Sequence, residues 1–206
     1  MDLGIDHVIL GVSDLQRGVD ALEQRTGVRA AYGGAHPGRG THNALLSLGA
    51  GRYLEIMAPD PQQQVSSPMI QELRALESLT PVGWAVAVGD VERVRGDLEG
   101  RGLRLSPTQP GSRARPDGTR LEWATFGVLA PDHPLAPFFI HWAAGTAHPS
   151  ATSPAGCTLE SLRLEDPNPA DLQAIVDPLG LAVPVTEGAQ SRIGMALSCP
   201  RGRIEF

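Results

Sequence analysis

One local pattern, repeated three times, constrains the fold of this chain of 206 residues more than any other feature. An alternating apolar strand is followed by a polar residue, an amphipathic helix and a glycine. The copies read IDHVILGVSDLQRGVDALEQRTGVRAA, VGWAVAVGDVERVRGDLEGRGLRLS and LESLRLEDPNPADLQAIVDPLGLAVPV. Ser13 or Asp14 can cap the first helix, and Asp90 stands where Asp14 stood. The helices end at Gly27, Gly102 and Gly180 in the three copies. The pattern predicts three copies of one supersecondary unit.

Further strands follow each helix, and the turns between them are rich in glycine and proline. They read THNALLSLG and RYLEIMAP in the first unit, TRLEWATFGV and APFFIHWAAG in the second, and SRIGMALSCP and GRIEF in the third. In the second unit, GLRLS supplies the strand directly after the glycine. We therefore predict an α+β protein in which residues 1–145 form two paired βαβββ units, 146–156 a linker and 157–206 a third βαβββ-like unit. SPMIQELRALES predicts a helix that links units one and two.

Composition excludes several classes of function. The net charge is −6 and no basic stripe is present, which argues against a nucleic-acid partner. All 17 basic residues are arginines, so lysine Schiff bases and Walker-type phosphate loops are excluded. No apolar run is long enough to span a membrane, and the start lacks a secretory signal. Cys157 and Cys199 have no metal-type spacing, which predicts reduced thiols in a cytoplasmic protein.

A carboxylate interrupts an otherwise apolar strand in RYLEIMAP. Side chains alternate between the two faces of a strand, so Leu54 and Ile56 share one face. These two suit the face that the helix of the unit covers. Glu55 then points away from the helix together with Tyr53 and Met57. Because a buried carboxylate needs a partner, the strand predicts a polar site on the uncovered face. The alternative is a buried pair of Glu55 with an arginine such as Arg52 or Arg120, or with a histidine.

Three further positions belong to that face in the same scheme. His7 lies opposite to Val8 in the first strand of unit one. Counting from the two capping aspartates, the counterpart of His7 in unit two is Gly83. The counterpart of Glu55, in PFFIHW, is His141.

These segments resemble a known superfamily. DHVILGVSDL, GGAHPGRGTHNALLSLGAGRYLEIMAPD, RPDGTRLEWATFG and PFFIHW are similar to glyoxalase-like domain proteins of the vicinal oxygen chelate superfamily. Glyoxalase I, extradiol dioxygenases and bleomycin-resistance proteins belong to it. The resemblance covers about residues 4–145 and implies that two βαβββ units pair and curl into a half-open cup.

The resemblance also implies where a metal ion is held, namely by the first and last strands of both units. Carried over, those positions are His7, Glu55, Gly83 and His141, which offer three ligands and a glycine. Two imidazoles and one carboxylate suit Fe, Mn, Ni, Co or Zn as a divalent ion. Glu55 is alternatively the catalytic base. The ligands are distributed differently from those of extradiol dioxygenases, so the composition of the set does not indicate ring cleavage.

The loop HPGRGTHN is expected near the mouth of the cup. His36 and Asn43 are candidates to bind substrate, and His42 is a candidate proton shuttle beside Glu55. The alternative is a glycine-rich turn with an exposed His36 and with Asn43 hydrogen-bonded within its own loop.

Other candidates line the cup or surround it. Tyr53, Met57 and Phe139 are expected to contact substrate. Arg113 and Arg115 either bind an anionic substrate or, as the composition of their segment favours, are solvated loop residues. His148 lies in a proline-rich loop and is expected to be exposed.

Two functions of different class follow. The first is a divalent-metal-dependent enzyme that chelates vicinal oxygens of a small substrate, with lyase, isomerase and dioxygenase chemistry unresolved. The second is a metal-free protein that binds or sequesters a small molecule, of the resistance type. Unit three lacks a partner unit, so it packs either on the first two units or across a homodimer, and we favour the homodimer.

Overall fold

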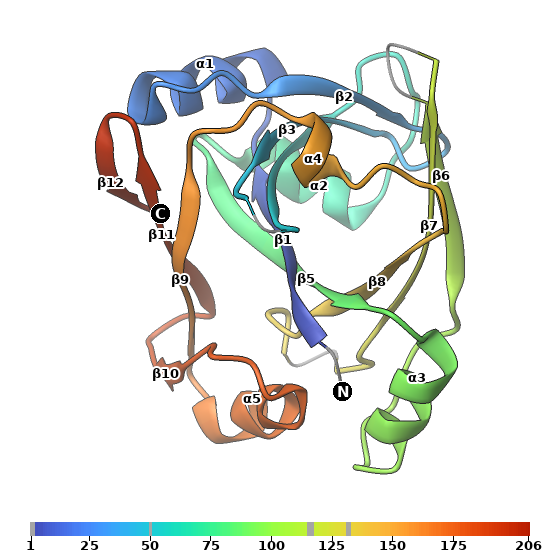
Figure 1. Ribbon diagram of the computed structural model, residues 1–206. Helices are drawn as coiled ribbons and strands as arrows, with labels where there is room; N and C mark the ends of the chain where they lie inside the picture. The colour runs from blue at the N-terminus through green and yellow to red at the C-terminus, as the bar shows by residue number, and fades with distance from the viewer. Residues whose placement is uncertain (1–2, 50, 115–117, 131–132) are drawn as a thin grey trace.

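The computed structural model describes residues 3–49, 51–114, 118–130 and 133–206 (Figure 1). Unit one comprises β1 (Leu3–Gly11), α1 (Leu15–Thr26), β2 (Ala31–His36), β3 (Thr41–Ser47) and β4 (Tyr53–Pro59). The helix α2 (Pro68–Ala75) leads to unit two, which comprises β5 (Thr80–Val88), α3 (Val91–Glu99), β6 (Gln109–Ala114), β7 (Arg120–Gly127) and β8 (Phe138–Trp142). The predicted helices form, and Asp14 and Asp90 accept hydrogen bonds at their N-termini as expected.

Units one and two form a single curled sheet with the strand order β2-β3-β4-β1-β5-β8-β7-β6. Each unit has the same internal order, because its first strand pairs in parallel with its last. The antiparallel pairing of β1 with β5 joins the two halves. This arrangement confirms the predicted α+β fold of paired βαβββ units. GLRLS was assigned wrongly, since the second strand of unit two is β6, and Leu105 makes only an isolated bridge to Val128.

The convex face of the sheet carries the hydrophobic core. Leu54, Ile56 and Val8 have no exposed surface, and they pack in one cluster with apolar residues of α1 and α3. Glu55 lies on the other, concave face, which we call the cup. The predicted direction of Glu55 is therefore correct.

Unit three follows the predicted element order but has a different topology. It comprises β9 (Thr158–Asp166), α5 (Pro169–Val176), a short 3-10 turn (Asp177–Leu179), β10 (Val185–Glu187), β11 (Arg192–Cys199) and β12 (Gly202–Glu205). Its sheet has the order β10-β9-β11-β12, so its first strand pairs with its third and second strands rather than with its last. The local pattern of unit three therefore matches the other two units, while its strand pairing does not.

Unit three packs on the first two units within the same chain (Figure 1). Leu162, Leu164 and Met195 belong to the same core cluster as the residues of β1 and β5. At the far edge, the backbone of Arg201 donates to Thr26 O (3.2 Å), and the guanidinium of Arg25 lies 4.0 Å from the ring centre of Phe206. Of the two packing alternatives, the structure shows the one within the chain. The homodimer stays a prediction.

A disulfide joins Cys157 to Cys199, at the start of β9 and the end of β11. The prediction of two unpaired thiols is therefore wrong, because antiparallel pairing of β9 with β11 brings together residues that lie far apart in sequence.

The cytoplasmic location, which depended on those thiols, remains a prediction. Within the described ranges, no helix combines the length and apolar character needed to cross a membrane.

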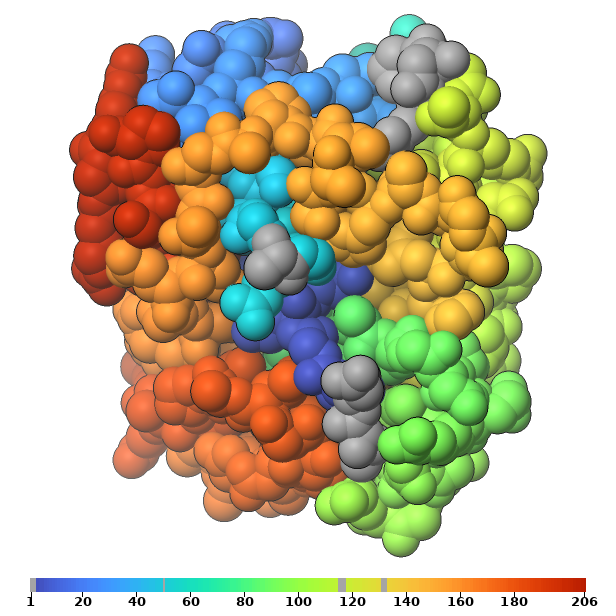
Figure 2. All heavy atoms as spheres, in the orientation of Figure 1, coloured from blue at the N-terminus to red at the C-terminus, as the bar shows by residue number. Residues whose placement is uncertain are grey.

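The linker between units two and three includes a short helix, α4 (Pro149–Thr152), and lies against unit one. Ser47, at the end of β3, donates its backbone N–H to Pro154 O (2.8 Å) and its hydroxyl to Ser150 O (2.6 Å). Figure 2 shows this segment, in orange, running across the face of the molecule beside the cyan residues of unit one. The linker is therefore a structured part of the molecule.

Candidate functional site

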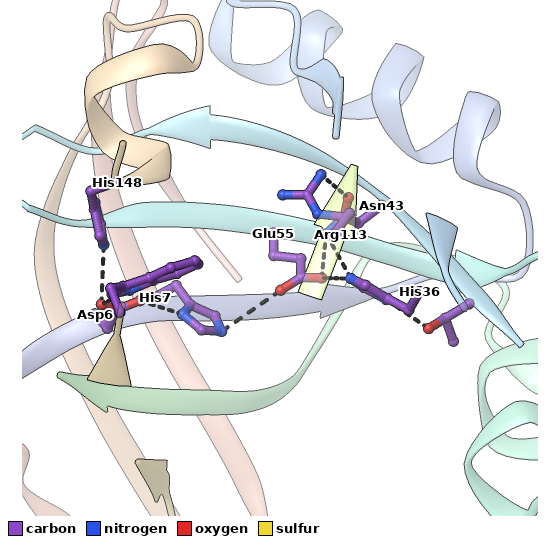
Figure 3. Close-up of polar contacts among 9 residues, drawn as sticks. Asp6, His7, His36, Asn43, Glu55, Arg113 and His148 are labelled. Atoms are coloured by element: carbon purple, nitrogen blue, oxygen red, sulfur yellow. Dashed lines mark hydrogen bonds and ion pairs between the residues drawn. The ribbon is translucent and has the colours of Figure 1, made fainter. Parts of the chain in front are cut away.

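A row of polar side chains crosses the cup, with Glu55 at its centre (Figure 3). Glu55 as a whole residue is 6% exposed. Its Oε2 lies 3.7 Å from Nε2 of His7, and its Oε1 lies 3.7 Å from Nε2 of His36. Oε1 also accepts a hydrogen bond from the side-chain amide of Asn43 (2.8 Å). Glu55 is thus held between two imidazoles of unit one, His7 and His36.

His7 is oriented by the residue before it. A β-bulge lies at Asp6, since Ile5 pairs with Val86 and His7 with Ala85, so β1 holds one extra residue there. Such a bulge re-aims a side chain, and it allows Asp6 to contact its neighbour. Oδ1 of Asp6 lies 2.6 Å from Nδ1 of His7.

Asp6 is ionised, because its environment favours the carboxylate. Burial raises the pKa of Asp6, but hydrogen bonds from His148 and His7 outweigh burial, and the pKa falls to about 2. An ionised carboxylate only accepts hydrogen bonds, so Nδ1 of His7 is the donor. The opposite nitrogen, Nε2, then faces Glu55.

His36 is held as a neutral imidazole on the other side of Glu55. Its Nδ1 lies 2.8 Å from the hydroxyl of Thr41, and its Nε2 lies 3.2 Å from the amide nitrogen of Asn43. Burial lowers the pKa of His36; the charge of Glu55 opposes this effect, and that of Arg113 adds to it. The glycine-rich turn forms over residues 37–40, and Asn43 contacts His36 within the loop, but His36 is half-buried, so the expectation of an exposed histidine is wrong.

One cationic side chain of unit two reaches the same cluster. Arg113, on β6, is 4% exposed, and its Nη1 donates to Oδ1 of Asn43 (3.2 Å). A Cβ at Gly33 would collide with both groups, so the glycine of β2 provides the space they occupy. The interpretation of Arg113 as a solvated loop residue is wrong, because the curled sheet brings its two edge strands, β2 and β6, together. Arg115 lies outside the described residues.

Aromatic side chains surround His7. Tyr53 stacks on its ring with centroids 4.4 Å apart, and Phe138 meets it edge-on at 5.4 Å. Burial, followed by the charges of Glu55 and Asp6, raises the pKa of Tyr53, which therefore stays a neutral phenol. Met57 is two residues along β4 from Glu55 and shares its face. His7 is thus flanked by one aromatic ring from each unit, Tyr53 of unit one and Phe138 of unit two.

His141 and Phe139 do not reach the cup. In unit one, Glu55 pairs with Ile9, and in unit two the equivalent of Ile9 is Ala85, which pairs with Phe138. Phe138, and not His141, is therefore the counterpart of Glu55. Because an odd shift in register moves a side chain to the other face, the predicted placement was wrong for both residues. Phe139 is fully buried in the core on Phe126, and Nδ1 of His141 lies 3.0 Å from Val88 O.

His42 also lies on the wrong face for its predicted role. It neighbours Asn43 on β3 and points to the opposite side, where its ring meets Tyr32 at 6.2 Å. There it helps to line a surface pocket of about 330 Å³ between α1, β2 and β3. A proton shuttle between His42 and Glu55 is not supported by this geometry.

The cup offers a poor donor set for the divalent metal ion that the superfamily implies. Of the predicted ligands, His7 and Glu55 lie together and His141 does not. The other cup-facing positions of unit two carry Gly83 and Phe138, which are not ligands. Among the described residues, no group of three His, Cys, Asp or Glu side chains is arranged to hold a metal ion. The nearby guanidinium of Arg113 further disfavours a second cation.

Sequence reasoning missed the residues that complete the cluster. Nε1 of Trp142 donates to Oδ2 of Asp6 (3.0 Å), and Nε2 of His148 lies 3.1 Å from the same oxygen. His148 is therefore not the exposed loop residue that was expected. Only the position of Asp6 directly before His7 was a usable signal, and the bulge that gives it meaning is invisible in the sequence.

The sequence model of the glyoxalase-like domain matches residues 5–180 of this chain. The protein belongs to the glyoxalase-like domain family. This membership, together with the paired βαβββ units, places it in the vicinal oxygen chelate superfamily. No curated protein matches its sequence.

Solved structures resemble this glyoxalase-like protein in fold. A hypothetical protein from Staphylococcus aureus is 15% identical, with a TM-score of 0.68 over 99% of this chain and 84% of that one. A methylmalonyl-CoA epimerase from Streptomyces coelicolor, in complex with 2-nitronate-propionyl-CoA, is 20% identical, with a TM-score of 0.51 over 70% of this chain and 97% of that one. A hypothetical protein from Bacillus halodurans is 15% identical, with a TM-score of 0.51 over 71% and 99% of the two chains.

Proposed function

We propose that this glyoxalase-like protein is an enzyme that removes and returns a proton on a small carbonyl compound, with Glu55 as the base. The observation that carries the proposal is the buried Glu55 carboxylate, which faces Nε2 of His7 at 3.7 Å. The opposite nitrogen of His7 is held by an ionised aspartate. A carboxylate and an imidazole in series are suited to general acid–base catalysis.

The proton transfer follows from these contacts. Glu55 takes a proton from the carbon next to the carbonyl. The electron pair of the C–H bond forms a carbon–carbon double bond, and the π pair of the carbonyl moves to its oxygen, which gives an enolate. The proton passes from Glu55 to Nε2 of His7, where the charge of Asp6 stabilises the imidazolium. Arg113, beside Asn43, favours the negative charge that develops on the substrate. Return of the proton to the face that it left regenerates the starting compound, and return to the opposite face inverts the carbon.

This proposal replaces metal-dependent chelation as the leading function, because the cup supplies two of the three predicted ligands. The metal-free binding protein remains a second candidate. The aromatic side chains of Tyr53, Phe138 and Trp142 favour it, since they give one wall of the cup an apolar character that suits a bound ligand.

Proton exchange with solvent tests the enzymatic proposal without knowledge of the product. Protein treated with a chelator is incubated in D2O with pyruvate, hydroxyacetone or an acyl-CoA thioester, and loss of the α-proton signal is followed by NMR. The thioester is included because one protein of similar fold is a methylmalonyl-CoA epimerase. We expect exchange on at least one compound and a loss of at least about 100-fold in Glu55→Gln.

Glu77→Gln is the matched control, because Glu77 is exposed on the surface. It should exchange protons at the parent rate. Absence of exchange on every compound, or equal rates in the parent and Glu55→Gln, contradicts the proposal. Ligand binding without exchange supports the binding protein instead.

A further inference from the structure

Asp6 connects β1 to the end of β8 and to the linker, both of which are distant from it in sequence. Its Oδ1 accepts a hydrogen bond from His7 of β1. Its Oδ2 lies 3.0 Å from Nε1 of Trp142, at the end of β8, and 3.1 Å from Nε2 of His148, in the linker. Asp6 is 1% exposed, so these contacts replace the water that an exposed carboxylate would bind.

The directions of the hydrogen bonds from Trp142 and His148 to Asp6 can be assigned. Indole nitrogen can only donate, so Trp142 can hydrogen-bond Asp6 in one sense. The backbone N–H of Ser150 donates to Nδ1 of His148 (3.2 Å), so the proton of this imidazole resides on Nε2 and points to Asp6. Two donors therefore converge on Oδ2, and Oδ1 is left for His7.

We propose that Trp142, the last residue of β8, and His148 of the linker fix the tautomer of His7 through Asp6. In this arrangement Nδ1 of His7 carries the proton, and Nε2 is the nitrogen offered to Glu55. Asp6, Trp142 and His148 are positioning residues, since they act through His7. The catalytic meaning of this arrangement rests on the proposed function of His7, but the tautomer itself does not.

The linker is anchored independently of Asp6, which allows it to act as a fixed support. Ser47 of β3 binds Ser150 O within the helix α4 and Pro154 O just after it. Figure 3 shows His148 reaching Asp6 from this helix, at the opposite end of the row from His36. Residues beyond the paired units thus contribute to the orientation of a group inside the cup.

Replacement of Asp6 by asparagine should reverse the tautomer of His7, and this reversal can be tested. An asparagine has one oxygen, and the two donors Trp142 and His148 require it. Its NH2 group is then forced towards Nδ1 of His7, which must become an acceptor. We expect the neutral His7 to carry its proton on Nδ1 in the parent and on Nε2 in Asp6→Asn.

The measurement is a long-range 1H–15N NMR spectrum of histidine-labelled protein, recorded at a pH where His7 is neutral. The His7 signals are identified by their loss in His7→Gln. The triple variant Asp6→Asn, Trp142→Phe, His148→Leu removes both donors that hold the amide oxygen. In this variant the oxygen can turn to His7, and we expect the proton to return to Nδ1.

Asp166→Asn is the matched control, because Asp166 is a second buried aspartate (2% exposed) that binds residues of unit three. It should leave the tautomer of His7 unchanged. An Nε2–H tautomer in the parent overturns the proposal, and this result requires no variant to fold. An unchanged tautomer in folded Asp6→Asn, or no return in the triple variant, also overturns it. Lack of proton exchange on carbonyl compounds contradicts only the proposed function, because the tautomer is measured without substrate.

Discussion

Units one and two share a topology but contribute different chemistry to the cup. Unit one contributes the acid–base groups His7, Glu55 and His36, and unit two contributes aromatic side chains and Arg113. Where unit one has Glu55, the strand register places Phe138 in unit two. Counted from the capping aspartates, Val82 and Gly83 stand in unit two where unit one has Asp6 and His7. The shared pattern therefore specifies the frame, and the differences specify the site.

This asymmetry explains why the metal prediction does not fit the structure. A site held by both units needs ligands at matching positions in the two halves. Here the matching positions of unit two carry no metal ligand, and the cationic group that it sends into the cup is an arginine. The polar cluster is instead stabilised by hydrogen bonds within unit one and by contacts from Arg113, Trp142 and His148.

The largest expected effect comes from closing the space between the two units. Gly33→Leu places a side chain where the amide of Asn43 and the guanidinium of Arg113 lie. Because buried polar groups then have to move, we expect a loss of about 3 kcal/mol in the free energy of unfolding. Gly83→Ala is the control, since its Cβ would meet Ile9 at an ordinary 3.7 Å. Urea denaturation distinguishes them, and equal stability would show that the close approach of β2 and β6 is not restrictive.

The next prediction concerns Asp6, a buried carboxylate of unit one that has no counterpart in unit two. The pKa of Asp6 falls from 3.8 to about 2 in the folded protein, so the carboxylate stabilises the fold when it is ionised. This contribution is present above about pH 4 and is lost as the pH falls towards 2, which amounts to about 2 kcal/mol. Asp6→Asn should lack this component. Urea unfolding at pH 4.5 and pH 2.5 measures it, and the same pH dependence in both proteins would argue against the charged network.

The smallest expected effect on stability comes from the helix N-caps, which units one and two share. Asp14 and Asp90 both cap a helix through a hydrogen bond to a backbone N–H three residues later. Replacement of either by alanine should cost about 1 kcal/mol of unfolding free energy. The two losses should agree within the error of thermal or urea denaturation. A large difference would mean that the capped helices are not equivalent, despite their matching positions.

The sequence predicted the parts of the site that depend on local pattern. Alternation along β4 correctly assigned Glu55 to the face opposite Leu54 and Ile56. It also placed His7 on the cup side of β1. The same reasoning failed at His141, because the pairing of β5 with β8 is set by contacts between residues about 50 positions apart. At Asp6, a bulge in the pairing with β5 changed the direction of the side chain.

The sequence by itself therefore determined the repeated strand–helix pattern, the aspartate N-caps of α1 and α3 and most of the order of strands and helices, since each depends on residues close together in the chain. Tertiary structure decided which of the candidate groups meet. Arg113 reaches Asn43 because the sheet curls until its edges approach, and His148 reaches Asp6 because the linker is tied to β3. The disulfide between Cys157 and Cys199 follows from strand pairing in the same way. Such contacts depend on the register and curvature of whole strands, which no short stretch of sequence specifies.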